Sequence, residues 1–581
     1  MARQANSLYN LLGRYRRSLT NYESALSYAL LGIVGGIVSG LVVLAFELTI
    51  RELGGLWGVA GGEDFESLPR WLTFALPVTG ATLLGLAFWA LRPEDREIGI
   101  VHVLSRMHSH YGALPWRNAV VQFVGGAFAL ATGQSGGREG PGVHLGGAAN
   151  SLIGQRLGLP NNSLRVLIAC GTAGGIAAAF NTPLAGVIFA MEVIIVEYTV
   201  AGFIPVMLSA VAASAVSRNI GVGGVGLFSI PAIELNSLWE IPYIILLGIC
   251  CGMAVALFIK ASSLAARLGH WPVVVRFALA GLLTGSLALV VPEVLGIGYD
   301  TLDAVLHGEV ALIALLTIAA CKLLATSFSC GVGMPIGLIG PNLIIGACLG
   351  GALGIAGEMI WPELASHQTL YIVIGMAAAM GAVLSAPLAA ILAVIELTQS
   401  IGIAMPALLA IVAANLTNTG VFRQRSAHRA VLRQLQRNLP DDPLNQLLHR
   451  TDVTSNMEMS VTRVPVLLDT SASQPLTNAT PTWCLIHRDK EDLYLVSGKE
   501  LVEWLQENAS SEEPADLTGA GIRRWTTGSV PVQATLRQAM DTIRAGTVEA
   551  VCVYGRGSGG NRVLQGVVTR ESIESFSLSR L

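Results

Sequence analysis

The sequence predicts an all-α membrane domain followed by a smaller α/β domain outside the membrane. Three observations support this fold class: an apolar composition, a series of apolar runs of spanning length, and a change to polar sequence after about residue 421. Of the 581 residues, 52% are hydrophobic and only 13% are charged, whereas soluble proteins carry about 25% charged residues. Most of the chain is therefore expected to lie in a membrane.

Apolar runs of about 20 residues, which suffice to cross a bilayer, occupy much of the first 420 positions. They lie near 26–48, 71–91, 117–133, 200–216, 240–263, 272–292, 309–327 and 402–418. Other apolar stretches are interrupted by Gly and Pro, as in GQSGGREGPGVHLGG and CGVGMPIGLIGPN. Non-helical backbone at membrane depth is tolerated only inside protein or beside a water-filled cavity, so these breaks predict discontinuous helices. The 65 glycines predict close helix packing through small residues.

An internal repeat relates the two halves of this region. Segments 171–193 and 375–397 align without a gap, with the same spacing from glycine to proline to glutamate. Upstream, the Gly-Pro pairs at 140–141 and 340–341 are each followed by a glycine five residues after the proline. In transporters, paired interruptions of this kind point to a binding site at the repeat interface.

Basic residues flank the apolar region and predict its orientation. Four arginines lie between residues 3 and 17, and five lie between 423 and 437. By the positive-inside rule, both termini are expected on the cytoplasmic side. No organellar sorting signal is evident in the sequence, so we expect the cell membrane of a prokaryote. The expected domains are a cytoplasmic segment 1–24, a transmembrane domain 25–435 and a cytoplasmic domain 436–581.

Charge and cysteine usage exclude other classes of site. The formal net charge is −3, and the sequence has no Lys-rich tract, so a nucleic-acid partner is not expected. The eight cysteines form no CxxC pair, and no spacing of ligand residues predicts a metal site.

Arg138 and Glu139 stand out because charged residues inside apolar runs are expensive and functional by default. The proline at 141 follows a glycine-rich approach and indicates a helix N-terminus, where backbone N–H groups and the helix dipole bind anions. The Glu139 carboxylate can therefore occupy the place of an anion and block the path until it is protonated or displaced. The alternative is a structural cap that satisfies free N–H groups.

GREGP at 137–141, FNTPLAG at 180–186 and GMPIGLIGP at 333–341 together resemble the CLC family of chloride channels and proton/chloride antiporters. The resemblance covers roughly residues 25–435. It implies a transport protein and not an enzyme: a homodimer in lipid, with one pore per subunit, built from two inverted repeats of tilted, broken helices. The expected cargo is chloride or a similar small anion.

The resemblance also assigns expected roles to single residues. Glu139 matches the gating glutamate of the family. The expected anion-binding positions are Gly137, Arg138, Gly140, Leu338, Ile339, Gly340, Ile98 and His428.

Three of these positions depart from the family pattern. Ile98 takes the place of the serine that contacts chloride, Ile339 that of a phenylalanine, and His428 that of the pore tyrosine. Backbone N–H groups can still bind the ion without these side chains, so the departures bear on anion preference.

The proton route of the antiporters is also altered. They usually carry two successive carboxylates, and here Glu192 is followed by Val193 at the internal proton-transfer position. The absent carboxylate favours a channel-like or weakly coupled protein. Glu197, on the same helical face as Val193, is a candidate substitute, and its alternative reading is an exposed helix-end residue. His144 lies five residues after Glu139, and His102, His108 and His110 follow the segment at 97–101. They are further candidates because histidine titrates near neutral pH; the alternative is that a buried histidine satisfies a local hydrogen bond.

The tail resembles a pair of CBS modules, through LRQAMDTIRAGTVEAVCVYG and LQGVVTRESI in the second copy. Such modules regulate transport in this family and in some members bind adenine nucleotides. Ser572 stands where an acidic residue is common, so we expect no bound cofactor and a dimerising, stabilising domain.

Two functions remain open from the sequence: anion conduction gated by Glu139, and proton/chloride antiport by a route that bypasses Val193. A membrane-anchored nucleotide sensor would explain the tail but not the repeated helix breaks.

Overall fold

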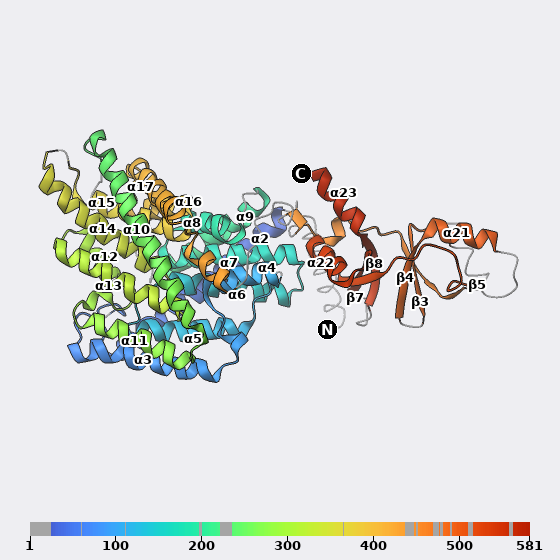
Figure 1. Ribbon diagram of the computed structural model, residues 1–581, viewed down its shortest axis with the longest axis horizontal. Helices are drawn as coiled ribbons and strands as arrows, with labels where there is room; N and C mark the ends of the chain where they lie inside the picture. The colour runs from blue at the N-terminus through green and yellow to red at the C-terminus, as the bar shows by residue number, and fades with distance from the viewer. Residues whose placement is uncertain are drawn as a thin grey trace. The chain divides into compact units, whose positions relative to one another are not determined.

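The structure is a computed structural model of the chain (Figure 1). It describes residues 25–59, 61–110, 112–196, 200–220, 235–363, 365–435, 447–448, 451–468, 476, 480–488, 491–508, 515–556 and 562–580.

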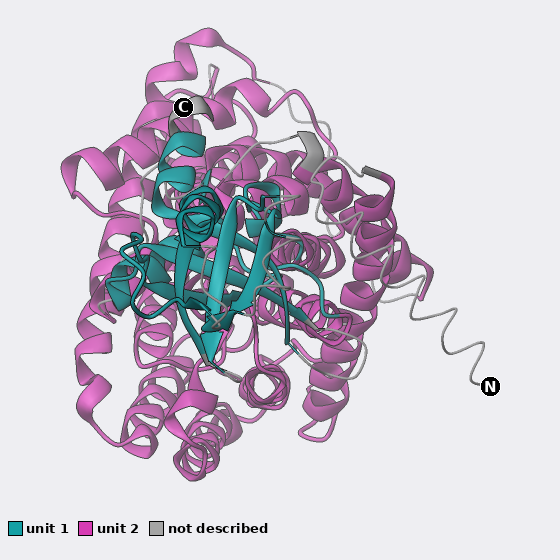
Figure 2. Cartoon of the chain, turned by 90° about the vertical axis from the view of Figure 1, so that its right-hand side faces the viewer, with its two compact units in different colours: residues 1–24, 158–163, 440–581 teal, residues 25–157, 164–439 magenta. Residues whose placement is uncertain are grey.

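The chain forms two compact units (Figure 2). The larger unit comprises residues 25–157 and 164–439, and the smaller comprises 1–24, 158–163 and 440–581. The domain limits expected at 24/25 and 435/436 stay predictions, because residues 1–24 and 436–446 lie outside the described part of the chain.

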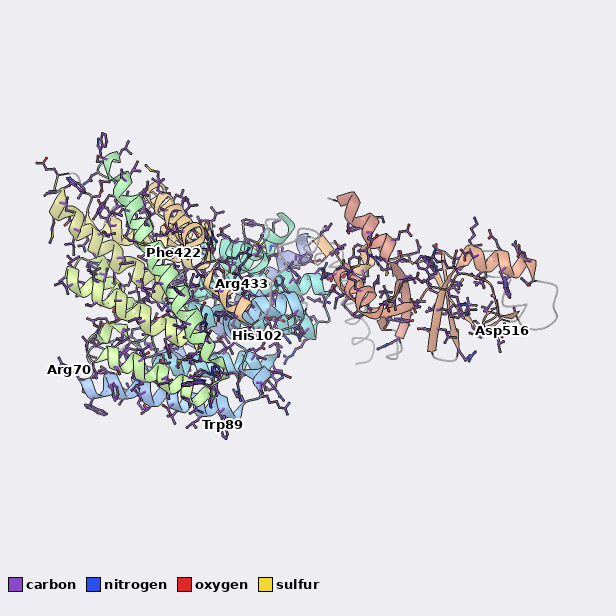
Figure 3. The ribbon with its side chains drawn as sticks, viewed as in Figure 1. Arg70, Trp89, His102, Phe422, Arg433 and Asp516 are labelled. Carbon is purple, nitrogen blue, oxygen red and sulfur yellow. The ribbon has the colours of Figure 1, made fainter. Side chains whose placement is uncertain are left out.

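Long apolar helices dominate the larger unit. In the described ranges, those of spanning length and composition are Leu26–Gly55, Arg70–Ala90, Asn161–Phe180, Leu238–His270, Leu312–Gly331, Ile339–Ile360 and Ala404–Val421. Large apolar side chains lie exposed on them, including Trp89 near one end of α3 (Figure 3). An exposed apolar surface of this extent is suited to lipid. The chain is an integral membrane protein.

The helices of the first half recur in the same order in the second. The first half contains α2 (Ala25–Gly55), α3 (Arg70–Ala90), α4 (Gly99–Ser109), α5 (Trp116–Ala131), α6 (Glu139–Arg156), α7 (Asn161–Phe180), α8 (Pro183–Phe189) and α9 (Val200–Asn219). Their counterparts are α10 (Ile241–Ala266), α11 (Val273–Ala288), α12 (Tyr299–Leu306), α13 (Leu312–Gly331), α14 (Ile339–Ile360), α15 (Gln368–Leu384), α16 (Pro387–Thr398) and α17 (Ala404–Leu416). Helix α18 (Ala427–Gln434) follows and packs against α4.

Contacts between the halves are reciprocal. Helix α3 packs against α11 and α8 against α16, so each of these helices touches its own counterpart. The Glu192 carboxylate accepts a hydrogen bond from Ala389 N (2.9 Å) at the start of α16. The Glu396 carboxylate likewise accepts one from Ala185 N (2.8 Å) at the start of α8. Self-complementary contacts of this kind indicate an approximate two-fold relation between the repeats.

Glycines set the close packing inside each half. A Cβ on Gly146 of α6 would lie 2.2 Å from Gly171 O of α7. In the second half a Cβ on Gly346 would lie 2.2 Å from Gly375 O. Because side chains would separate these helices, the small residues hold α6 and α14 against their neighbours.

The smaller unit contains two similar arrangements of strands. In the first, β3 (Trp483–Arg488) lies between parallel β1 (Val461–Pro465) and antiparallel β4 (Glu491–Ser497), and α21 (Gly498–Glu507) follows. In the second, β7 (Ala550–Arg556) lies between parallel β6 (Thr527–Pro531) and antiparallel β8 (Arg562–Thr569). Helix α22 (Leu536–Gly546) connects β6 to β7, and α23 (Arg570–Arg580) ends the unit. A short pair, β2 (Leu467–Leu468) and β5 (Ala515–Asp516), completes the strands. The expected α/β domain is therefore present.

Candidate functional site

The two predicted helix breaks meet inside the larger unit. Gly137 and Gly337 form an antiparallel bridge, with Gly137 N donating to Gly337 O (2.8 Å) and Gly337 N donating to Gly137 O (2.7 Å). Helix α6 begins two residues later at Glu139, and α14 begins at Ile339. The bridge therefore brings two helix N-termini, one from each repeat, to the same place in the core.

The Glu139 carboxylate lies on the N-terminus of α14. One carboxylate oxygen accepts a hydrogen bond from Gly340 N (3.2 Å), and the other accepts one from the Tyr299 hydroxyl. The Glu139 side chain is completely buried. A negative group thus occupies a backbone N–H donor at a helix N-terminus, a position that favours anions.

Arg138 balances charge beside this carboxylate. Its guanidinium forms an ion pair with Glu47 of α2, donates to Ala179 O (3.1 Å) and lies 5.2 Å from the centre of the Tyr299 ring. These partners orient the Arg138 side chain toward α2 and α7. Arg138 was expected to bind an anion, and in this structure its cation neutralises Glu47.

Acidic residues in the loop between α2 and α3 add to the field around Glu139. Burial raises the pKa of Glu63 to about 7, and the charges of Asp300, Glu47 and Glu139 raise it further against the opposing effect of Arg138. Burial likewise raises the pKa of Glu66 to about 7. The site therefore has carboxyl groups nearby that titrate at neutral pH.

The other expected anion-binding residues lie around the two helix starts or near α4. Leu338 precedes α14, and Ile339 is fully buried as its first residue. Ile98 precedes α4, where Gly99 N donates to the Gln122 side chain (2.8 Å). His428 is buried on α18, which packs against α4, and its Nδ1 has no partner in the described part of the chain.

The expected proton-route residues behave differently from one another. Glu192 bonds to the start of α16 through Leu388 N and Ala389 N. Val193 packs against the main apolar core. Glu197 lies outside the described residues.

Sequence reasoning missed Tyr299, Glu47 and Glu63. Tyr299 lies 160 positions from Glu139, in a short helix without a break, so its sequence position gives no signal of the contact. Glu47, an acid inside the first apolar run, carries the same signal that identified Glu139.

These observations define a class: an integral membrane protein in which two broken-helix N-termini, one from each repeat, meet beside one buried anionic group. Residues 80–419 match the family described as voltage gated chloride channel. The chain belongs to this family, the CLC family.

Relatives and solved structures agree with the family. A ClcB-like protein of Ralstonia nicotianae is 33% identical over 404 residues, covering 67% of this chain and 92% of the relative. The H(+)/Cl(-) exchange transporter ClcA of Vibrio cholerae is 31% identical over 447 residues, covering 74% and 95%. A crystal structure of a eukaryotic CLC transporter matches with a TM-score of 0.59 and 19% identity, covering 94% of this chain and 97% of that one. At that identity the structural match shows the fold alone.

Proposed function

We propose that this protein transports chloride across its membrane and that the Glu139 carboxylate gates the path. The observation that carries the proposal is the hydrogen bond from Gly340 N to Glu139. Through it a tethered carboxylate occupies the donor that a free anion would need. Chloride passes when this carboxylate leaves, and the backbone N–H groups at Gly140 and 338–340 then hold the ion, whereas the Gly137 N–H is already bonded to Gly337 O.

Flux from liposomes of purified protein tests this proposal. Wild-type protein should release chloride well above empty liposomes. Glu139→Gln, which removes the ionisable competitor, should abolish most of the pH dependence of that flux. The matched control is Glu52→Gln, because Glu52 is exposed on α2; this variant should behave as wild type. Absence of chloride flux from folded wild-type protein would overturn the proposal.

A second candidate function is proton/chloride exchange. It is favoured by the ClcA relative, which is named as an exchange transporter, and by the neutral-pH carboxyl group of Glu63 near Glu139. The valine at 193 favours uncoupled conduction instead. Simultaneous measurement of proton and chloride flux decides: proton movement against its gradient, driven by chloride, establishes exchange.

The smaller unit is proposed to be a cytoplasmic CBS-like pair that dimerises and stabilises the protein without a bound nucleotide. Its support is the repeated strand arrangement with matching parallel and antiparallel pairing. Ser572 donates to Thr569 O (2.8 Å) at the start of α23, so this side chain is engaged in its own helix cap. Equilibrium dialysis with an adenine nucleotide should detect no binding. We further propose a homodimer in a prokaryotic cell membrane with both termini cytoplasmic.

A further inference from the structure

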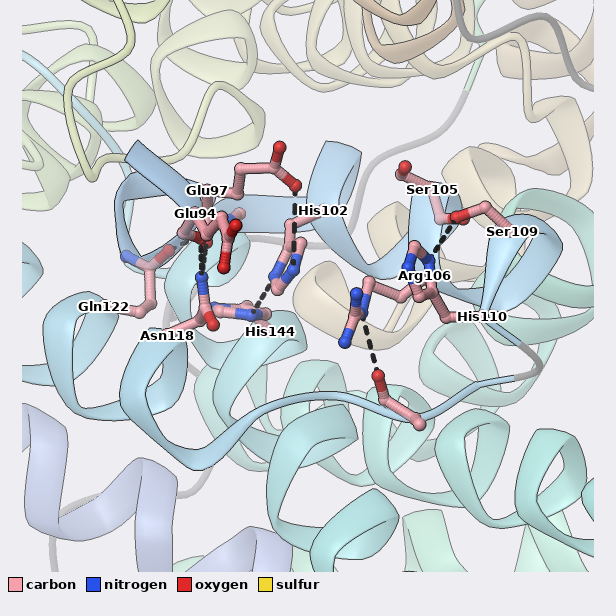
Figure 4. Close-up of polar contacts among 12 residues, drawn as sticks. Glu94, Glu97, His102, Ser105, Arg106, Ser109, His110, Asn118, Gln122 and His144 are labelled. Carbon is pink, nitrogen blue, oxygen red and sulfur yellow. Dashed lines mark hydrogen bonds and ion pairs between the residues drawn. The ribbon is translucent and has the colours of Figure 1, made fainter. Parts of the chain in front are cut away.

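Two buried histidines lie against each other beside the transport helices. His102 Nδ1 of α4 lies 3.0 Å from His144 Nε2 of α6, and the rings meet edge to face with centroids 5.1 Å apart (Figure 4). His102 is 3% exposed and His144 is 0% exposed. Helix α6 begins at Glu139, so the pair is attached to the helix that carries the gate.

The pair has one end toward solvent and one end in the core. His102 Nε2 lies 4.0 Å from the carboxylate of Glu97, whose side chain is 37% exposed (Figure 4). At the other end His144 Nδ1 is buried and has no hydrogen-bond partner in the described part of the chain. The arrangement therefore runs from a solvent-accessible acid to an open nitrogen inside the protein.

Two tautomer assignments fit the contact between His102 and His144. In the one that places Nε2–H of His102 toward Glu97, His102 Nδ1 carries a lone pair and accepts the hydrogen bond from His144 Nε2–H. His144 Nδ1 is then a bare lone pair.

We propose that His102 and His144 form the internal proton-transfer site of this protein, in place of the carboxylate that is absent at Val193. The proposal rests on the second candidate function, proton/chloride exchange. A proton bound at His144 Nδ1 releases the one on Nε2 to His102 Nδ1, and His102 releases its Nε2 proton to Glu97. The relay gains one proton at the core end and loses one at the solvent end, and each ring must then return from its Nδ1–H to its Nε2–H tautomer by proton exchange with water before a second proton moves in the same direction.

The remaining step joins His144 to Glu139. Five residues of helix correspond to about 7.5 Å along the axis of α6. A proton that crosses that length requires about two bridging water molecules. Glu139 receives or delivers the proton when its carboxylate has left Gly340, so the gate and the relay act in sequence.

A purely structural role explains the pair poorly. His108 on the same helix α4 shows the ordinary arrangement, a ring nitrogen 2.9 Å from Leu104 O one turn away. The buried Nδ1 of His144, by contrast, has no hydrogen-bond partner among the described residues, which is unfavourable for a purely structural residue. No group of three metal-ligating side chains occurs among the described residues, so a metal site does not explain the pair either.

Other charged groups lie near α4 and set the local field. They are Arg106 and His108 on α4 itself, Arg165 on α7, and His428 and Arg429 on α18. Arg106 donates to Ala113 O (2.8 Å). The His102–His144 contact joins α4 to the gate helix through titratable groups.

The test measures proton and chloride flux together from liposomes of the full chain. His144→Gln and His102→Gln each keep a polar side chain but cannot relay a proton. Each should reduce chloride-driven proton uptake at least tenfold, while chloride flux stays within about threefold of wild type. The double variant should be no worse than either single variant, because both rings serve one step. His108→Gln is the matched control and should remain coupled.

The outcomes distinguish failure of the proposed proton relay from failure of the proposed chloride transport. If wild-type protein moves no chloride, the proposed function fails. If wild-type protein moves chloride without protons, chloride transport stands and the relay is overturned. If His144→Gln remains fully coupled, the relay is likewise overturned. Should that variant not yield monodisperse protein, His102→Gln decides by the same criterion, because it interrupts the same relay at its other ring.

Discussion

The two helix breaks have similar backbone conformations but carry chemically different side chains. Both turn through a glycine with positive φ, Gly133 (81°) and Gly333 (89°), and both start a helix six residues later. At the helix start, however, one break carries Arg138 and Glu139, whereas the other carries Leu338 and Ile339. In the proposed function, the backbone of each repeat therefore builds half of the anion site, and the first repeat supplies the carboxylate that closes it.

The largest effect on chloride flux should come from disturbing the backbone bridge between Gly137 and Gly337, to which both repeats contribute. A Cβ on Gly337 would lie 2.7 Å from Gly140 N and 2.8 Å from Gly137 O, and neither backbone atom can move without opening the bridge. We expect Gly337→Ala to reduce chloride flux at least 100-fold or to prevent assembly, as measured by liposome flux and size-exclusion chromatography. Gly55→Ala, where a Cβ meets nothing within 4 Å, is the control. Normal flux in Gly337→Ala would mean that the bridge is dispensable.

The next largest effect on chloride flux should come from the hydrogen bond between Tyr299 and Glu139, because only the first repeat carries a glutamate at this helix start. Tyr299→Phe removes a hydrogen bond to the Glu139 carboxylate, and bonds to charged groups contribute about 1.5–3 kcal/mol. The carboxylate should leave Gly340 more readily, so chloride flux should rise about tenfold. Tyr243→Phe, which removes a hydroxyl bonded to Leu353 O (2.7 Å), should leave flux unchanged. An equal response in both variants would show that the tyrosine does not hold the gate.

A smaller effect is expected from Glu63, which belongs to the first repeat. Its pKa of about 7 means that Glu63 changes from mostly protonated at pH 6 to mostly ionised at pH 8. The negative charge then repels approaching anions, so this residue should lower chloride flux about two- to threefold as pH rises across that window. In Glu63→Gln this part of the pH profile should vanish, and the comparison is made by measuring flux from pH 6 to 8. A pH profile of chloride flux in Glu63→Gln that is identical to that of wild type would show that Glu63 does not influence the transport path.

The smallest effect should be a loss of stability that is similar for equivalent glutamates in the two repeats. Glu192 and Glu396 each bond to the helix start of the opposite repeat, and loss of such a contact costs about 1 kcal/mol. Glu192→Ala and Glu396→Ala should therefore lower thermal stability in detergent by similar amounts, and neither should change the ratio of proton to chloride flux. Loss of coupling in Glu192→Ala alone would assign Glu192 to the proton route and break the symmetry.

Much of this fold could be predicted from the sequence, because the breaks carry local signals. Gly and Pro inside apolar runs mark helix starts whatever surrounds them, and α6 and α14 begin within the predicted segments 133–147 and 330–342. The sequence separation between equivalent residues of the two repeats also agrees with the helix lengths. This separation is 200 positions at the first break and 204 at the second, because α14 has 22 residues and α6 has 18.

Other features required the structure. The spans 161–180 and 339–360 were not among the predicted runs, although their hydropathy is similar to that of spans that were predicted. Contacts between distant helices, such as Tyr299 with Glu139 and His102 with His144, depend on packing that no local pattern records. The position of a carboxylate could be predicted, but not the helix whose N–H it meets.

The reciprocal contact of Glu192 and Glu396 also bears on how such a chain could arise. A single repeat with one glutamate and one Pro-initiated helix can satisfy both contacts by pairing with a second copy of itself. Duplication and fusion of its gene would then tether the two copies at no loss of stabilising contacts. Once joined, one copy was free to acquire Arg138 and Glu139 while the other kept an apolar helix start, which a pair of identical subunits could never do.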